Sequence, residues 1–460
     1  MKKILLFMML MVVATLAVAP AVLANELQSG QAVQLQEDVE LIRNSKVVGS
    51  LPAGAVVTFV QFEEDRTRIQ IADTTYIVTS HNVEATNIAP SVIKRVKAAY
   101  PLTLVAKSGA TITDGNGTVL QVLEKGQKLS LQGMQDKLGV VDYLSGSAYI
   151  DLKSFHSVDL VDGSKKLTFA EMEYKLQVVA AMYPSITKLQ KIGQSVEGRN
   201  LYALKLGTGK KEILMDASFH AREYMTTNVL MEMMDTYLKA YINGSKIGSY
   251  DVRSVLNNVS IVFVPMVNPD GVTLAQGGKV STSMQKLVAR NNGSSKFDRW
   301  KANINGVDLN RQFVYGWKEI QSSKVSYKGY KGSAPFTEPE ALAMKRFIDN
   351  SNHLNYVSYH SSGQIIYWGK PKNDKQYARA QKLVKGVSKI TGYSIVPITS
   401  KNKPIGTAED YYRIVKTRPS MTVEIAPYGG EASVPLKQWQ NVWKRNATVG
   451  LYAASEASKW

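Results

Sequence analysis

The chain has 460 residues, about three times the length of a typical domain, so we expect two or three domains. Apolar residues make up 44% of it and charged residues 20%, which excludes a disordered or collagen-like chain. It has no cysteine, which excludes disulfides, thiolate metal sites and a cysteine nucleophile. The net charge of +18 has two explanations. It either keeps the protein soluble by like-charge repulsion, or it attracts an anionic partner such as nucleic acid, a membrane surface or a cell wall.

The N-terminus has the pattern of a secretory signal. A basic Met-Lys-Lys start precedes an almost unbroken apolar run over residues 4–18, and small residues follow up to a predicted cleavage site after Ala24. The alternative is an uncleaved anchor, but the run is short for a membrane span and no positive charge follows it. We expect residues 1–24 to be removed and the mature protein to be secreted, where its charge meets a cell wall rather than nucleic acid.

Residues 25–160 predict small all-β domains. Short alternating apolar segments recur between turn residues, and the segment SLPAGAVVTF matches VLEKGQKLSL in pattern at a shift of 72 residues. This region resembles a tandem of bacterial SH3-like domains, which are common wall-binding accessories, and we expect one domain over residues 25–90 and a second over residues 91–160. The alternative is a single β-rich prodomain that masks the domain after it.

Residues 165–460 predict one α/β domain, which follows a polar hinge at residues 162–166. Apolar strand runs alternate with helical patterns, which is typical of a largely buried central sheet. Functional residues in such sheets gather beyond the carboxyl ends of the strands. We expect strands at residues 202–206, 212–217, 259–264, 355–359 and 420–425, and helices at residues 169–182, 226–241, 338–350 and 375–391.

Two histidines and a glutamate follow these strands. His220 and Glu223 stand three residues apart where a strand ends and a helix begins, so both side chains share one face, as a zinc site requires. His360 ends another strand and is the expected third ligand. His353 lies in a polar helix exit, and we expect it to be a solvated surface residue. His81 and His156 have no evident companions.

Three further sets of residues fit hydrolysis at such a site. Glu424 lies in an apolar strand, where a carboxylate is costly to bury unless it has a role, and it could be the general base or half of a salt bridge. Asn310 and Arg311 offer a fork of donors suited to a carboxylate. Upstream, Arg299 and Lys301 flank a tryptophan and add cations.

These motifs together resemble the zinc carboxypeptidases of the funnelin type, the family of carboxypeptidase A, over about residues 168–455. The motifs that carry the resemblance, in chain order, are GQSVEGR from residue 193, HARE from 220, NPDG from 268, GVDLNR from 306, YHS from 359 and TVE from 422. The resemblance implies an α/β fold with a mixed central sheet and flanking helices, and one Zn²⁺ per chain.

The resemblance also implies residue roles. His220, Glu223 and His360 correspond to the zinc ligands and Glu424 to the general base. Asn310 and Arg311 correspond to the residues that hold the substrate's terminal carboxylate. The family's oxyanion cation is an arginine after a tryptophan; here that position is Lys301, and Arg299 takes the role only by a shift of register.

Two positions depart from the digestive enzymes of the family. Their mobile tyrosine falls, by an ungapped count, on Asn402. The residue that lines their specificity pocket falls on Glu409, and an acid there is expected to favour a cationic side chain or an amino group.

The preferred interpretation is a secreted, wall-associated zinc metallocarboxypeptidase that cleaves peptidoglycan stem peptides at the γ-D-glutamyl–diaminopimelate bond, as some relatives of this type do. The alternatives are a general extracellular metallocarboxypeptidase with basic preference and a non-catalytic wall-binding protein. The last is disfavoured because all three ligands and the base are present.

Overall fold

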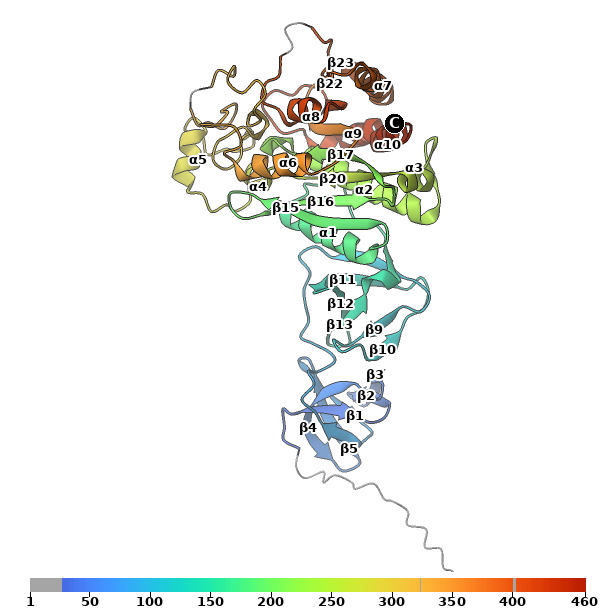
Figure 1. Cartoon of the computed structure of the whole chain (residues 1–460). Coiled ribbons are helices and arrows are strands. Elements are labelled where there is room, and N and C mark those ends of the chain that lie inside the picture. Colours follow the sequence, from blue (N-terminus) through green and yellow to red (C-terminus); the bar gives the residue numbers. More distant parts are fainter. Residues whose placement is uncertain (1–26, 323, 400–402) are drawn as a thin grey trace, which may run out of the picture. The chain divides into compact units, whose positions relative to one another are not determined.

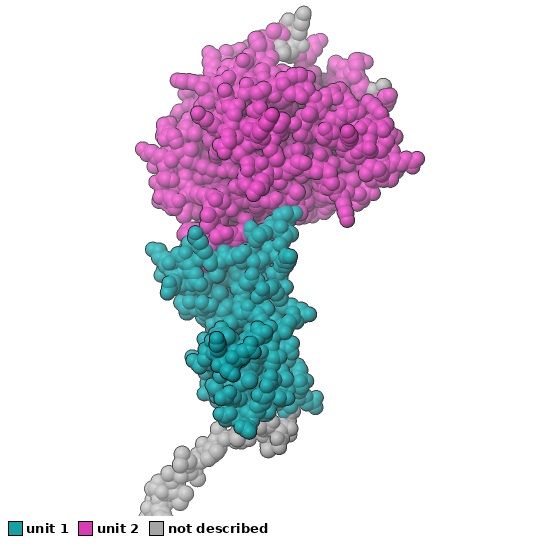
Figure 2. Space-filling model, turned by 180° about the vertical axis from the view of Figure 1, so that it is seen from behind, with its two compact units in different colours: residues 1–101, 105–154 teal, residues 102–104, 155–460 magenta. Residues whose placement is uncertain are grey.

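The computed structural model describes residues 27–322, 324–399 and 403–460. The chain divides into two compact units, one of residues 1–101 and 105–154 and the other of residues 102–104 and 155–460 (Figure 2). The predicted signal at residues 1–24 and Asn402 lie outside the described residues. No helix in the described ranges is long and apolar enough to cross a membrane.

The N-terminal β region contains two seven-stranded antiparallel sheets with the same strand order. The first sheet runs β3-β2-β6-β5-β4-β1-β7, and the second runs β10-β9-β13-β12-β11-β8-β14, which is the same order displaced by seven strands. The 72-residue sequence repeat is therefore a structural repeat as well. The strands are β1 Ala32–Leu35, β2 Val39–Arg43, β3 Lys46–Leu51, β4 Val56–Glu63, β5 Arg66–Ile71, β6 Thr74–Val78, β7 Val83–Ala85, β8 Leu102–Ala106, β9 Thr111–Thr113, β10 Val119–Val122, β11 Lys128–Gln135, β12 Leu138–Tyr143, β13 Gly146–Asp151 and β14 Phe155–Ser157.

The link between the repeats is hydrogen-bonded to both sheets. Ser91 accepts a hydrogen bond from the backbone N–H of Val56 in the first sheet and donates one to Asp114 beside the second. Gly146 has no room for a side chain, because a Cβ there would lie 2.2 Å from the Ile93 carbonyl oxygen. All-β structure is confirmed, while the domain limits 25–90 and 91–160 stay predictions.

The second unit contains a mixed eight-stranded sheet in the order β15-β16-β20-β17-β21-β24-β22-β23. The central strands β20, β17, β21 and β24 are parallel to one another, and β15, β16 and β22 are antiparallel to their inner neighbours. The predicted α/β fold with a mixed sheet is thus confirmed. The strands are β15 Thr187–Gln194, β16 Asn200–Leu206, β17 Lys211–Ala217, β20 Val259–Val264, β21 Tyr356–Ser361, β22 Ile365–Trp368, β23 Ser394–Ile395 and β24 Ser420–Ile425, with a separate pair β18 Lys246–Ile247 and β19 Tyr250–Asp251.

Helices cover both faces of this sheet (Figure 1). Helices α2, α3 and α10 contact β17 or β20, whereas α6 contacts β15 and α8 contacts β21 and β24. The α-helices are α1 Phe169–Met182, α2 Met225–Asn243, α3 Val252–Asn258, α4 Pro269–Ala275, α5 Met284–Arg290, α6 Pro339–Asp349, α7 Asp374–Thr391, α8 Ala408–Lys416, α9 Trp439–Asn446 and α10 Val449–Ser458, and the short 3₁₀ helices are η1 Leu152–Ser154, η2 Ala221–Glu223, η3 Leu309–Arg311 and η4 Leu436–Gln438.

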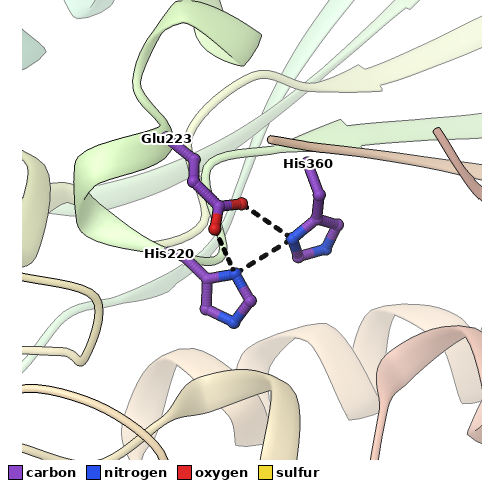
Figure 3. A group of neighbouring side chains, drawn as sticks. All are labelled: His220, Glu223 and His360. Atoms are coloured by element: carbon purple, nitrogen blue, oxygen red, sulfur yellow. Dashed lines mark hydrogen bonds and ion pairs between the residues drawn. The ribbon is translucent and has the colours of Figure 1, made fainter. Parts of the chain in front are cut away.

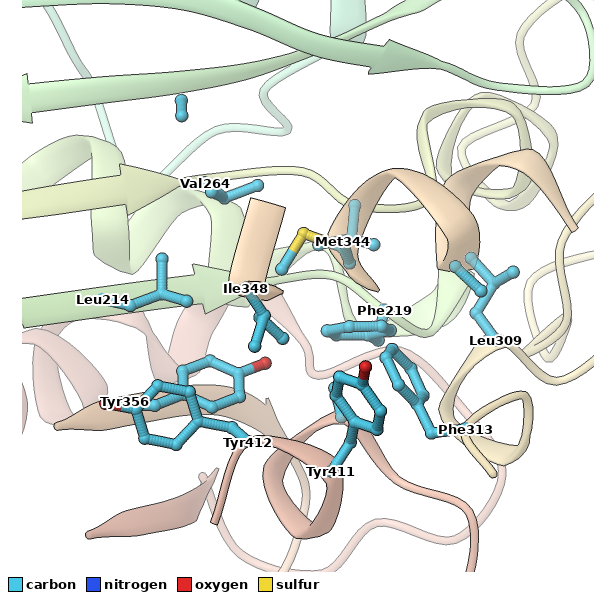
Figure 4. Packing of buried hydrophobic residues seen from close by; sticks show 14 of the residues in the cluster. Leu214, Phe219, Val264, Leu309, Phe313, Met344, Ile348, Tyr356, Tyr411 and Tyr412 are labelled. Carbon is cyan, nitrogen blue, oxygen red and sulfur yellow. The ribbon is translucent and has the colours of Figure 1, made fainter. Parts of the chain in front are cut away.

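Successive residues of strand β17 pack on opposite faces of the sheet. Leu214 of β17 is buried with Met344 of α6 and Tyr412 of α8 (Figure 4). The next residue, Met215, places its sulfur against the position of Gly450 in α10. Side chains of a strand alternate between its two faces with a period of two residues. Because helices bury both faces here, β17 and β20 contain runs of consecutive apolar residues.

Local sequence signals set the helix limits near the site. Thr168 caps α1 by accepting a hydrogen bond from the backbone N–H of Glu171, and the helix stops before Tyr183-Pro184 because the residue before a proline disfavours helical geometry. Helix α2 ends at Gly244, which takes the left-handed conformation with φ 64°. With its ends fixed, α2 packs against β17 and β21, the two strands that lead into the site residues.

Candidate active site

The three predicted metal ligands come together at the carboxyl ends of β17 and β21. His220 follows β17 and precedes η2, Glu223 is the last residue of η2, and His360 lies in β21 (Figure 3). Nδ1 of His220 lies 3.0 Å from Oε1 of Glu223, and Nδ1 of His360 lies 3.0 Å from Oε2 of Glu223. All three side chains are buried, and their ligand atoms lie within 4.8 Å of one another.

The donor atoms of this cluster fit a zinc ion. Nδ1 of His220 and Nδ1 of His360 are 3.0 Å apart. The opposite nitrogen, Nε2, faces Asp308 at 3.1 Å in His220, and in His360 it lies 3.4 Å from both Oε1 of Glu409 and Nδ2 of Asn310. A neutral imidazole that donates through Nε2 keeps its lone pair on Nδ1. Two lone pairs and a carboxylate therefore point at one spot, an arrangement that a divalent cation stabilises and that matches zinc's preference for nitrogen and carboxylate ligands.

Glu424 lies beside this cluster. In the parallel pairing of β21 and β24 it stands directly opposite His360, so the two residues share one level of the sheet. Burial and the nearby negative charge of Glu223 raise the pKa of Glu424 above its usual range, while His360 and Lys301 act in the opposite direction. A carboxylate with a raised pKa is better suited to take up and release a proton near neutrality.

A single cavity of about 510 Å³ joins the predicted residues. Its wall contains two of the metal ligands, the expected base and the expected substrate-binding residues, whereas the third ligand, Glu223, is buried and is not part of the wall. The predicted site residues in the wall are His220, Lys301, Asn310, Arg311, His360, Glu409 and Glu424.

The structure distinguishes between the two candidate oxyanion cations. Arg299 donates from its guanidinium to the side chain and backbone of Asn291 and stacks 4.2 Å over the ring of Tyr327. Lys301 lines the cavity, and within the described ranges its ammonium has no hydrogen-bond or ion-pair partner. Of the two, Lys301 is therefore the cation available to a bound substrate.

Asn310 and Arg311 also lie in the cavity wall, in η3. Asn310 is held from both ends of its amide: its Oδ1 accepts from the backbone N–H of Ala408 at 2.9 Å, and its Nδ2 donates to Glu409 at 3.3 Å. The guanidinium of Arg311 donates to the Asn310 carbonyl, and among the described residues it has no carboxylate partner. Its remaining donors can serve a substrate carboxylate.

Glu409 lies at the start of α8 and is buried at the cavity wall. Its Oε1 lies 3.4 Å from Nε2 of His360 and accepts a hydrogen bond from Thr422 at 3.1 Å. Burial alone would raise the pKa of Glu409, but its contact with His360 lowers that pKa to about 2. The predicted pocket acid is in place, and it already has partners within the protein.

The expectation for His353 is wrong. The residue is 1% exposed, packs against the ring of Phe347, and lies just ahead of β21, away from the metal cluster. Burial and the charges of Lys416 and Arg418 lower its pKa to about 3. Polar neighbours in the sequence suggested exposure, but the helix exit at residues 350–352 turns His353 inward.

Asp308 is a site residue to which sequence reasoning assigned no role. It is buried, caps η3 through the backbone N–H of Asn310, and faces Nε2 of His220. A histidine that binds a metal usually donates its second ring N–H to an acceptor. That requirement could have pointed to Asp308, the acid two residues before Asn310, as the partner of His220.

Comparison with known proteins agrees with this geometry. The sequence pattern of the zinc carboxypeptidase family, Peptidase_M14, matches residues 172–445, which is more than half of the chain. The fold, the three-ligand cluster and this match together identify the chain as a member of the zinc carboxypeptidase family, a metallopeptidase hydrolase that uses zinc.

Several relatives share this family. Gamma-D-glutamyl-L-diamino acid endopeptidase 1 of Lysinibacillus sphaericus is 33% identical over 300 residues, which cover 64% of this chain and 73% of that protein. Metallocarboxypeptidase A of Trichophyton rubrum is 28% identical over 284 residues, or 56% of this chain and 63% of that one. Among solved structures, bovine thrombin-activatable fibrinolysis inhibitor superposes with a TM-score of 0.51 at 20% identity, over 65% of this chain and 99% of that chain, which shows the shared fold.

Proposed function

We propose that this protein is a secreted zinc peptidase that hydrolyses the bond between γ-D-glutamate and diaminopimelate in peptidoglycan stem peptides. The observation that carries the proposal is the 33% identity to a gamma-D-glutamyl-L-diamino acid endopeptidase over 73% of that relative's length. The cavity of the present chain gives independent physical support, because its charges suit a substrate with several carboxylates.

The cations of the cavity wall outnumber its available acids. Among the described residues, Lys301, Arg311, Lys370 and Lys403 line the cavity without an acidic partner. Of the three acids in the wall, Glu409 is engaged with His360 and Asp410 with Arg413, which leaves Glu424 as the one acid there without an ion-pair partner among the described residues. A peptide that ends in an ordinary residue brings one carboxylate, whereas a γ-linked glutamate keeps its α-carboxylate and diaminopimelate carries two. The excess of cations therefore favours the stem peptide.

The proposed roles follow from position. His220, Glu223 and His360 would hold zinc, which supplies Lewis-acid polarisation of the scissile carbonyl when bound. Glu424 removes a proton from the attacking water and delivers it to the leaving amine. Lys301 stabilises the negative charge that develops on the carbonyl oxygen, and Arg311 with Asn310 holds a substrate carboxylate. Lysine is a point charge, so Lys301 needs less exact alignment than the family's arginine does.

Secretion and wall association belong to this proposal. The apolar run at residues 4–18 supports export, and the duplicated SH3-like pattern of the β region supports a wall-binding accessory.

Product analysis tests the proposal. The purified protein is incubated with L-Ala-γ-D-Glu-meso-diaminopimelate and with a lysine-ended peptide, and the products are weighed. We expect release of diaminopimelate at the higher rate, loss of activity with a zinc chelator, and recovery on adding zinc. Preferential release of lysine would instead support the general basic carboxypeptidase, and no release from either peptide would support a non-catalytic wall-binding protein.

A further inference from the structure

We infer that Glu409 is a positioning residue for the zinc ligand His360, and not the anion that receives a substrate ammonium. In this role its carboxylate accepts the Nε2–H of His360 and holds the ring so that Nδ1 points at the metal. The inference depends on zinc binding at His220, Glu223 and His360. It does not depend on which peptide the enzyme cleaves.

The contacts of Glu409 occupy both of its oxygens. Oε1 lies 3.4 Å from Nε2 of His360 and accepts from Thr422 at 3.1 Å, while Oε2 accepts from Nδ2 of Asn310 at 3.3 Å. The side chain is 7% exposed. These three contacts use most of the carboxylate's acceptor capacity, and a substrate ammonium that displaced one of them would leave a buried group without its partner, which costs about 1–3 kcal/mol.

The residue is also held firmly by its backbone. Its carbonyl accepts a hydrogen bond from Ser420 at the start of β24, and Thr407 caps α8 just ahead of it. The carboxylate therefore extends from a fixed helix start toward a fixed strand, as the role of orienting a ring requires.

The second ligand histidine is arranged in the same way. His220 faces Glu223 through Nδ1 and the buried Asp308 through Nε2 at 3.1 Å. Each imidazole thus has one nitrogen toward the metal position and the other toward a buried carboxylate. Carboxylate partners of this kind fix the tautomer and increase the basicity of the ligand nitrogen, and their loss costs about 10–100-fold in metal affinity.

The two possible roles of Glu409, positioning His360 or binding a substrate ammonium, predict different effects of its substitution on zinc affinity. We would measure the zinc dissociation constant by competition with a chromophoric chelator, and the melting temperature of the metal-free protein, for the wild type and for Glu409→Gln and Glu409→Ala. The control is Asp410→Asn, which removes the neighbouring acid, whose carboxylate pairs with Arg413 rather than with a histidine.

We expect Glu409→Gln to bind zinc about tenfold more weakly and Glu409→Ala up to about 100-fold more weakly, with Asp410→Asn unchanged. Activity at subsaturating zinc should fall equally for diaminopimelate-ended, lysine-ended and leucine-ended peptides. If Glu409→Ala fails to fold, Glu409→Gln alone decides. Zinc affinity within twofold of wild type in Glu409→Gln would overturn the inference, and a loss confined to substrates that carry a side-chain ammonium would assign Glu409 to substrate binding.

Discussion

At the scale of single residues, the buried acids of the site differ in pKa because their neighbours differ. Glu223 and Glu409 contact histidine nitrogens, and these contacts keep their pKa values low against the effect of burial. Glu424 has no such contact, so burial and the charge of Glu223 raise its pKa. Of these three acids, Glu424 therefore fits best the general base of the proposed function.

The first prediction concerns this base. Glu424→Gln should keep its zinc and bind substrate, yet lose about 10²–10⁴-fold in kcat, because only proton transfer is removed. Metal analysis, substrate binding and steady-state rates check it. A variant that turns over at nearly the normal rate would assign the general base to another group.

The second prediction concerns the third ligand. His360→Ala should lose most of its zinc and all measurable turnover, because two ligands hold zinc far less tightly than three. His353→Ala is the matched control: it should keep one zinc per chain while melting at a lower temperature, since the substitution empties a buried position. Full zinc content in His360→Ala would remove that residue from the site.

At the scale of elements, adjacent parallel strands place the chemistry. β17, β21 and β24 are neighbours in the sheet, and they lead into or carry His220, His360 and Glu424. Periodicity predicts these strands because they are long, apolar and buried on both faces. It did not predict α8, a short helix of nine residues that supplies Glu409. The partner of Glu409 is a histidine 49 residues away in the sequence, and no local pattern could indicate that contact.

The third prediction concerns the buried His353, between α6 and β21. Its pKa is about 3 in the folded protein, against about 6.5 in an unfolded chain, so the unfolded state binds the extra proton first. Its contribution to stability is therefore complete above about pH 6.5 and is lost as the pH falls toward 3. At pH 4.5 the loss should be about 2–3 kcal/mol.

Replacing His353 with a residue that does not titrate should remove this dependence. We expect the metal-free His353→Leu variant to lose less stability between pH 7.5 and pH 4.5 than the metal-free wild type does, as followed by chemical unfolding at each pH. The metal is removed from both because protonation of the zinc ligands would otherwise add its own pH dependence. Equal losses in the two proteins would show that His353 is not the responsible group.

At the scale of the whole molecule, the positive charge is unevenly divided. Residues 27–154 contain 12 Lys and Arg against 13 Asp and Glu, whereas residues 155–460 contain 42 against 24. The net charge of +18 thus resides in the catalytic region. If the protein binds an anionic wall as proposed, the electrostatic attraction has to come from that region, and binding by the β region has to rest on specific contacts.

The fourth prediction follows from this division. Deleting residues 27–157 should leave hydrolysis of small soluble peptides unchanged and weaken binding to whole cell walls, while the binding that remains should be abolished by about 1 M salt. The deletion stops before the buried Leu160, whose backbone N–H bonds to Asp235 of α2. Pelleting with purified walls at low and high salt measures both parts of the binding.

Two results would contradict this prediction. Loss of the salt-sensitive part on deletion would place electrostatic binding in the β region despite its balanced charge. A large rise in activity on soluble peptides would show that the β region is an inhibitory prodomain, which is the alternative that its sequence left open.

The proposed function requires that the cavity select a γ-linked glutamate followed by a diamino acid. The most direct test compares kcat/KM for two isomers, L-Ala-γ-D-Glu-meso-diaminopimelate and L-Ala-α-D-Glu-meso-diaminopimelate, with the zinc-loaded enzyme. The charges near the scissile bond are the same in both isomers and only their placement differs, so we predict at least about a tenfold preference for the γ-linked isomer, the effect of one charge-assisted pair. Equal rates, or a preference for the α-linked isomer, would contradict the proposed substrate.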